Sequence, residues 1–128
     1  MSDRVVHFEV PFDDGDRARS FYKEIFGWNV MEMPGMDYTM VMSGPSGDNG
    51  PTEPGYINGG MASRANLPAS GPVITIGVED IDATLSRIEE TGGSRMGEKV
   101  PVGEMGFAAY FKDCEGNVLG LWQNAPQS

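Results

Sequence analysis

The chain has 128 residues, a length typical of one domain that can bury a hydrophobic core. Hydrophobic residues make up 39% and charged residues 22%, which is the balance of a folded protein rather than a disordered one. The formal net charge of −10 argues against nucleic acid and anionic membranes as partners, because both attract positive surfaces.

The sequence contains no feature that is typical of an exported protein. The sequence shows no signal peptide and no apolar run of membrane-spanning length. Cys114 is the single cysteine, so neither an intrachain disulfide nor a multi-cysteine zinc cluster can form. We therefore expect a cytoplasmic protein.

The first half of the chain predicts a strand, a helix and three more strands. Residues 4–10 alternate as a strand, and residues 13–27 carry apolar positions at helical spacing. Asp14 or Asp16 can cap this helix, and Gly27 ends it. The three later strand-like stretches are residues 28–33, 37–44 and 56–62, with a Gly/Pro-rich loop at residues 45–55.

The second half predicts the same order after a linker at residues 63–72. Residues 73–78 read as a strand, and residues 79–93 read as a helix with Ile81, Leu85 and Ile88 on one face. A possible short strand lies within residues 94–106, and a hairpin joins residues 107–113 and 117–123 around a turn at 114–116.

A shift of 66 residues aligns the two halves without a gap. It places Val10 on Ile76, Asp14 on Asp80, Asp16 on Asp82, Ser20 on Ser86, Glu24 on Glu90 and Gly27 on Gly93. Because six such matches in register are hard to obtain by chance, the chain is predicted to be a tandem βαβββ repeat.

Three motifs make the chain resemble the vicinal oxygen chelate superfamily, which includes glyoxalase I, bleomycin-resistance proteins and extradiol dioxygenases. The motifs are VVHFEVPFDDGDRARSFYKEIFGW, VEDIDATLSRIEETGG and YFKDCEGNVLGLWQ. The last is similar to a D-P-x-G-N ending, with Cys114 in the place of proline. The resemblance implies an α+β fold, a single glyoxalase-like domain over residues 1–128. Its tandem βαβββ modules, 4–62 and 72–123, form a cup of mixed β-sheet with the helices outside.

The resemblance also implies four metal-ligand positions, on the first and last strand of each module. His7 stands at the first position, whereas the third and fourth fall on Val73 and Gly120. The second falls within INGGM, residues 57–61, which offers no carboxylate or imidazole. One donor is too few to hold a divalent ion tightly, so we expect no metal and no other cofactor. The alternative is a divalent metal ion held by a non-standard set that includes His7 and Glu9.

His7 is the only histidine of the chain, and strand alternation places it on one face with Val5 and Glu9. Such a pair can act as a general base with an orienting carboxylate. It can also form the polar wall of a ligand site, and we expect His7 to line the cup. No catalytic residue is assigned.

The cup positions of the second module are largely apolar. Val73, Gly77 and Gly120 leave space where the metal and its ligands would lie, which suits an apolar or aromatic molecule. Methionines in equivalent segments of the two modules are adaptable contacts for the rim of the cup. These methionines are Met33, Met36, Met40 and Met105.

The sequence therefore predicts metal-independent binding of a small apolar or aromatic molecule. The expected ligand-binding residues are His7, Glu9, Thr75, Met105, Val118, Gly120 and Trp122. The alternatives are a metal-dependent lyase or dioxygenase, and an interaction module with a vestigial site. A homodimer is expected from the resemblance, with the cup formed either within one chain or across the dimer.

Overall fold

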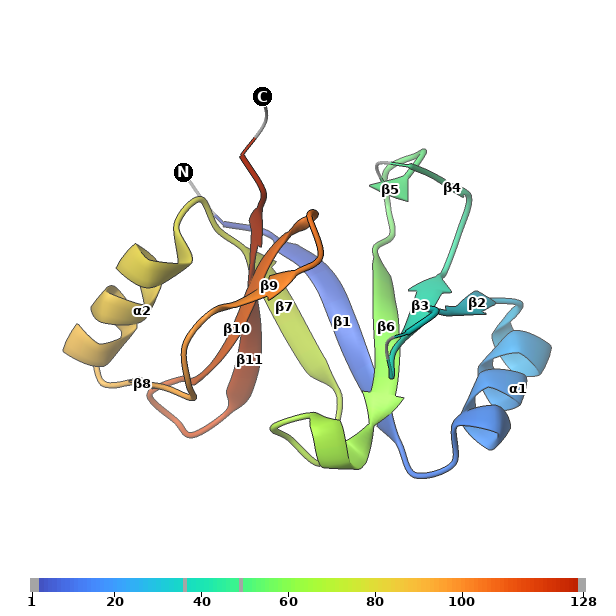
Figure 1. Cartoon of the computed structure of the whole chain (residues 1–128), viewed down its shortest axis with the longest axis horizontal. Coiled ribbons are helices and arrows are strands. Elements are labelled where there is room, and N and C mark those ends of the chain that lie inside the picture. Colours follow the sequence, from blue (N-terminus) through green and yellow to red (C-terminus); the bar gives the residue numbers. More distant parts are fainter. Residues whose placement is uncertain (1–2, 36, 49, 127–128) are drawn as a thin grey trace. The chain divides into compact units, whose positions relative to one another are not determined.

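The computed structural model describes residues 3–35, 37–48 and 50–126 of the chain (Figure 1). The helices of the described residues are α1 (Gly15–Phe26), α2 (Ile81–Glu90) and the short 3-10 helix η1 (Arg64–Asn66). The strands are β1 (Val5–Phe12), β2 (Asn29–Glu32), β3 (Thr39–Met42), β4 (Ser46–Gly47), β5 (Gly50–Pro51), β6 (Asn58–Ser63), β7 (Val73–Gly77), β8 (Ser94–Arg95), β9 (Val100–Val102), β10 (Gly106–Lys112) and β11 (Val118–Asn124).

Nine of these strands belong to one mixed sheet, which confirms the predicted α+β class. The strand order is β2-β3-β6-β1-β7-β11-β10-β8, and β9 pairs with β10. The first and last strands of each predicted module are parallel neighbours, namely β1 with β6 and β7 with β11. The repeat seen in the sequence is therefore also a repeat of strand pairing.

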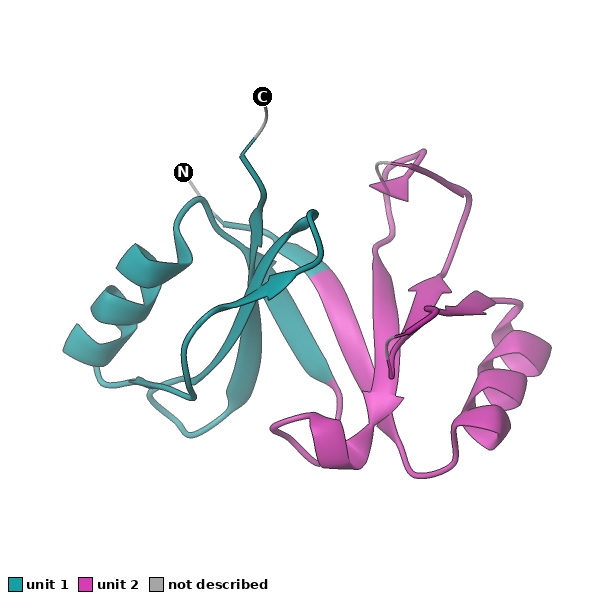
Figure 2. Ribbon diagram, in the orientation of Figure 1, with its two compact units in different colours: residues 1–6, 73–128 teal, residues 7–72 magenta. Residues whose placement is uncertain are grey.

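The chain divides into two compact units (Figure 2). Unit 2 comprises residues 7–72, and unit 1 comprises residues 1–6 and 73–128. The predicted first module begins at residue 4, whereas in the structure the start of β1 belongs to unit 1. Residues 4–6 join unit 1 because the backbone pairs there: the Gly77 N–H donates a hydrogen bond of 2.9 Å to the Arg4 carbonyl. That the two units make one domain stays a prediction.

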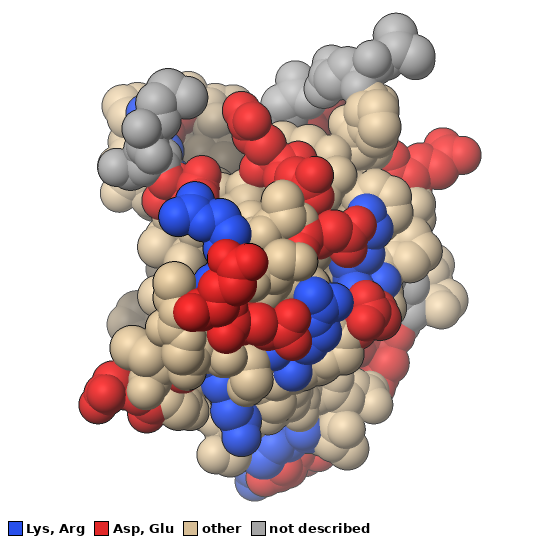
Figure 3. Space-filling view, turned by 90° about the vertical axis from the view of Figure 1, so that its left-hand side faces the viewer, with Lys and Arg blue, Asp and Glu red and all other residues tan. Residues whose placement is uncertain are grey.

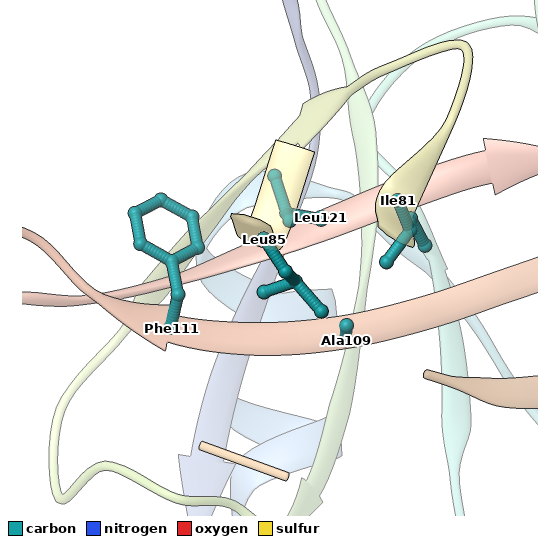
Figure 4. Close-up of a cluster of buried hydrophobic side chains, with 5 residues drawn as sticks. All are labelled: Ile81, Leu85, Ala109, Phe111 and Leu121. Atoms are coloured by element: carbon teal, nitrogen blue, oxygen red, sulfur yellow. The ribbon is translucent and has the colours of Figure 1, made fainter. Parts of the chain in front are cut away.

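Helix α2 covers one face of the strands of unit 1 (Figure 4). The Asp80 carboxylate accepts a hydrogen bond from the Ala83 N–H at the start of this helix, as an N-cap does. Ile81 and Leu85 lie one turn apart and are completely buried. With them in one buried hydrophobic cluster lie Ala109, Phe111 and Leu121 of the β10–β11 hairpin.

Helix α1 begins with the equivalent cap, since Asp14 accepts a hydrogen bond from the Arg17 N–H. It ends at Phe26, and Gly27 adopts the left-handed conformation with φ of 71°. The predicted stop of α2 at Gly93 is wrong, because α2 ends at Glu90. The N–H groups of both Thr91 and Gly93 bond the Ile88 carbonyl, which closes that helix early.

The two helices differ in what they bury. Among the described residues, α1 contributes no fully buried side chain, whereas α2 contributes Ile81 and Leu85. Phe21, Ile25 and Phe26 are each more than half exposed. Two helices with matching caps thus play different packing roles.

The connections are more structured than the sequence predicts. The loop predicted at residues 45–55 contains the β4–β5 hairpin, the predicted linker contains η1, and the single short strand expected within 94–106 is two strands, β8 and β9.

The β10–β11 hairpin is confirmed, and its turn depends on Asp113. The Asp113 carboxylate accepts hydrogen bonds from the N–H groups of Glu115 and Asn117 and from the Asn117 side chain. Gly116 supplies the positive φ of 83° that the turn requires. These bonds hold the turn with Cys114, which is exposed, in the place of proline.

Charges of both signs are mixed on the side where α2 lies (Figure 3). There Arg95 pairs with Glu89 and Glu98, and Lys99 pairs with Asp82. This face therefore offers no uniform basic surface to a polyanion. No helix of the described residues combines the length and the apolar character needed to cross a bilayer.

The contrast between the helices predicts unequal costs of truncation. Leu85→Ala should lower the free energy of unfolding by about 2–5 kcal/mol, because it leaves a cavity in a packed core. Ile25→Ala removes a side chain that is 61% exposed, so its effect should stay within about 0.5 kcal/mol. Urea unfolding followed by circular dichroism measures both, and equal losses would contradict this description of the core.

Candidate functional site

The strand pairing of unit 2 places His7 and Glu9 on one sheet face. In the parallel register of β1 and β6, His7 lies opposite Asn58 and Glu9 opposite Gly60. Met40 of β3 lies opposite Gly60 in the next strand pair, so it shares this face. The alternation that the sequence suggested for His7 and Glu9 is therefore confirmed.

Tyr38, which the sequence analysis did not single out, links the two predicted residues. Its hydroxyl donates a hydrogen bond of 3.0 Å to Oε2 of Glu9. Nε2 of His7 lies 2.9 Å from the same hydroxyl oxygen. We call these three side chains the His7–Tyr38–Glu9 network.

Gly60 makes room for this network. A Cβ atom at Gly60 would overlap the Tyr38 hydroxyl group. Any residue larger than glycine at this position would therefore displace Tyr38 from Glu9. The double glycine at residues 59–60 was the available sequence signal, but nothing in it pointed to a tyrosine 22 positions earlier.

Burial sets the electrostatics of the network. Glu9 is only 7% exposed, and His7 and Tyr38 are half-buried. Burial lowers the pKa of His7 below its ordinary value of 6.5, and the nearby Glu9 carboxylate opposes that shift only in part. This shift favours the neutral imidazole of His7 at neutral pH.

The opposite face of unit 2 belongs to α1. Phe8 contacts Trp28 there, and Arg19 of α1 donates a hydrogen bond to Thr39. A solvent-open depression on the α1 side is lined by Asp16, Arg19, Ser20, Lys23, Val30 and Glu32. Arg19 is already paired with Asp16 and Glu32. Its positive charge is therefore compensated and does not make this depression a site for an anionic ligand.

Four of the predicted residues share one face of unit 1. Gly120 lies opposite Thr75, and Trp122 opposite Gly77, in the parallel pair of β7 and β11. Val118 follows the same alternation, whereas Leu119 and Leu121 point to the α2 side. The three ligand-binding residues predicted on β11 thus lie on the face away from the α2 core.

The predicted open space at Gly120 is wrong. A Cβ atom at Gly120 would lie 2.8 Å from the Thr75 hydroxyl oxygen, so Thr75 already fills this space. The indole ring of Trp122 packs on Gly106, and its N–H donates a hydrogen bond of 2.7 Å to Asn124. Replacing Gly120 by leucine would therefore displace Thr75 rather than fill an empty site.

The rim methionines lie in different settings. Met105 is 54% exposed in the turn between β9 and β10, and Met40 is half-buried beside Gly60. Met33 is half-buried and bonds Tyr38 through its backbone N–H, and Met36 lies outside the described residues. That residues of both units line one cup, with Met105 at its rim, stays a prediction.

The residues at the implied metal positions do not fit a tightly held divalent ion. Val73 and Gly120 have no donor atoms in their side chains, and Val73 is buried in the core. The Asn58 side chain is engaged with Ser43 and Ser46. Within the described residues, no three His, Cys, Asp or Glu side chains are grouped to hold a metal.

Comparison with known families and proteins gives a consistent result. Residues 4–44 match a family model described as bleomycin resistance protein-like N-terminal. A probable lactoylglutathione lyase of Vibrio cholerae is 31% identical over 126 residues, which cover 94% of this chain and 91% of that protein. A glyoxylase-like domain-containing protein of Didymella fabae is 28% identical, over 92% of this chain and 91% of the relative.

Other relatives differ in length or share only the fold. CFP32 of Mycobacterium tuberculosis is 27% identical, and this chain spans 41% of its length. The crystal structure of methylmalonyl-CoA epimerase from Mycobacterium tuberculosis superposes with a TM-score of 0.65 at 16% identity, covering 95% of this chain and 88% of that one. That similarity extends the shared fold over nearly the whole chain.

The single histidine permits a direct test of the network. Its NMR titration should have a midpoint below 6.5. The folded state then holds fewer protons than the unfolded state between its own pKa and 6.5, so the free energy of unfolding should increase as the pH rises through this window. His7→Gln should remove this increase. A midpoint at or above 6.5 would contradict the burial of a neutral His7.

Proposed function

This chain belongs to the vicinal oxygen chelate superfamily, among its glyoxalase-like and bleomycin-resistance-like proteins, and on that premise we propose that it binds a small apolar or aromatic molecule without a metal ion. The ligand lies on the sheet face of unit 2 that carries His7 and Glu9. These two side chains supply the polar wall, and Met31 and Met40 of the same unit supply apolar contacts.

One observation carries this proposal, namely the hydrogen-bonded His7–Tyr38–Glu9 network on the sheet face of unit 2 opposite α1. Small-molecule sites are mostly apolar surfaces with a few polar groups held in place. Tyr38 holds both polar side chains at once. Met31 and Met40, paired in register across β2 and β3, add adaptable apolar surface next to it.

Catalysis is the second candidate function, because the Vibrio cholerae relative is described as a probable lactoylglutathione lyase. A lyase or dioxygenase of this kind would need a metal site built from His7, Glu9 and donors outside the implied positions. The lack of donors at Val73 and Gly120 favours binding over this candidate. An interaction module with a vestigial site remains the third reading.

Two measurements test the proposal. Elemental analysis of untagged protein should find well under one equivalent of nickel, zinc, iron or manganese, and adding these metals should leave the melting temperature unchanged. A neutral aromatic dye, N-phenyl-1-naphthylamine, should bind with increased fluorescence. His7→Ala should weaken this binding by about five- to tenfold, since one hydrogen bond contributes about 1 kcal/mol.

The control is Glu32→Gln, which changes a 71% exposed side chain on the α1 side and should not affect the dye. A stoichiometric metal that is lost in His7→Ala would favour the enzyme instead. Dye binding that is equal in the parent and in His7→Ala would place the site elsewhere.

A further inference from the structure

We infer that the ligand of this site is an uncharged or cationic aromatic molecule with a hydroxyl or N–H donor, and that anionic ligands are excluded. This inference rests on the proposed binding function and specifies the chemistry of its ligand. It follows from the direction of the hydrogen bonds in the His7–Tyr38–Glu9 network.

The direction is determined by counting protons. Tyr38 has one hydroxyl proton, and it donates this proton to Glu9. The bond between His7 and Tyr38 must then take its proton from the ring, so Nε2 of His7 carries the hydrogen. A neutral imidazole has one N–H, and Nδ1 of His7 is therefore left as a hydrogen-bond acceptor.

This acceptor is not used by a hydrogen bond within the described part of the chain. Among the described residues, His7 makes its hydrogen bond to Tyr38 through Nε2 and none through Nδ1. The lowered pKa of His7 agrees with a ring that remains neutral. A ligand hydroxyl, amide N–H or ammonium group can donate to Nδ1, whereas a carboxylate or phosphate cannot.

The buried Glu9 carboxylate adds charge selectivity. Glu9 lies behind Tyr38 and is 7% exposed, where screening by water is weak. A second negative charge near it would be repelled, and a positive charge would be attracted. The net charge of −10 acts in the same sense at longer range.

A matched series of naphthalene probes tests the inference by displacement of N-phenyl-1-naphthylamine. The members are 2-naphthylmethanol, its methyl ether, 2-naphthylmethylamine and 2-naphthoate. The alcohol and the amine should displace the dye at about tenfold lower concentration than the carboxylate, and at about fivefold lower concentration than the ether.

Variants assign each preference to its group. The nitrogen NMR spectrum of the single histidine in the parent should show the Nε2–H tautomer. Tyr38→Phe should reduce the advantage of the alcohol over its ether, because the His7 ring is then no longer oriented by a hydrogen bond. Glu9→Gln should reduce the discrimination against 2-naphthoate, whereas Glu32→Gln should not. If the dye binds but all four probes displace it equally, the inference is wrong and the proposed function stands. If neither dye nor probes bind, the proposed function itself is wrong.

We also infer, from an independent observation, that the exposed face of α1 pairs with α1 of a second copy of this chain. Arg17, Phe21, Glu24 and Ile25 recur at helical spacing, and all four are exposed. We call them the α1 face. Phe21 and Ile25 are 53% and 61% exposed, and apolar side chains grouped in this way are typical of interaction surfaces.

Charge complementarity identifies the occupant as the same helix in antiparallel orientation. Arg17 lies four residues before Phe21, and Glu24 lies three residues after it. A two-fold axis near Phe21 therefore places Arg17 of each copy opposite Glu24 of the other. Among the described residues, the side chains of Arg17 and Glu24 have no ion-pair partner within the chain.

Sedimentation equilibrium of the parent and of variants with altered charges on the α1 face tests this pairing. The parent should sediment at twice the chain mass at micromolar concentration. Phe21→Glu should sediment as a monomer, because it sets two carboxylates against each other at the axis. Arg17→Glu should weaken the dimer at least tenfold, and the double variant Arg17→Glu, Glu24→Arg should restore it.

The control is Val100→Glu, which adds the same charge at a 54% exposed apolar residue of β9 and should leave the mass unchanged. Circular dichroism confirms that each variant is folded. A monomeric parent, a dimer that survives Phe21→Glu, or a double variant that stays monomeric would each overturn the pairing.

Discussion

The buried carboxylate of Glu9 is the constraint around which the candidate site is arranged. A carboxylate removed from water must be hydrogen-bonded, and the Tyr38 hydroxyl provides a bond of 3.0 Å. Tyr38 reaches Glu9 because Gly60 has no side chain in its path. Gly60 lies opposite Glu9 because β1 and β6 pair in this register. A shift of one residue would bring Gly59 or Met61 to that position and turn the network away.

The same tandem repeat has produced two different units. Both helices start with an aspartate cap, and each belongs to a module whose first and last strands pair in parallel. α2 nevertheless fills a core with Ile81 and Leu85, while α1 leaves aromatic surface exposed. This asymmetry separates the roles of the modules, because unit 1 holds the buried hydrophobic cluster under α2, and unit 2 carries the polar network and the exposed α1 face.

The superfamily resemblance implies four metal-ligand positions, and this chain does not fill all of them with donor side chains. His7 occupies the first implied ligand position, whereas Val73 and Gly120 occupy the third and fourth. The structure joins one imidazole, one hydroxyl and one carboxylate by hydrogen bonds at the first of these positions. Under the proposed function, this network recognises a ligand by the direction of its hydrogen bonds and by charge, rather than by coordination. A donor-bearing neutral or cationic molecule would satisfy both criteria.

The sequence by itself determined the fold class, the repeat and the face assignments, because these depend on local periodicity and on caps. The period of two placed His7 with Glu9, and Gly120 with Trp122, and the structure agrees. Only the tertiary structure decided that Tyr38 joins His7 to Glu9, that Thr75 fills the space at Gly120, and that α2 ends before Gly93. The physical reason is that each of these depends on the register between strands far apart in the sequence, or on backbone bonds at a helix end, neither of which the pattern of residue types along one strand contains.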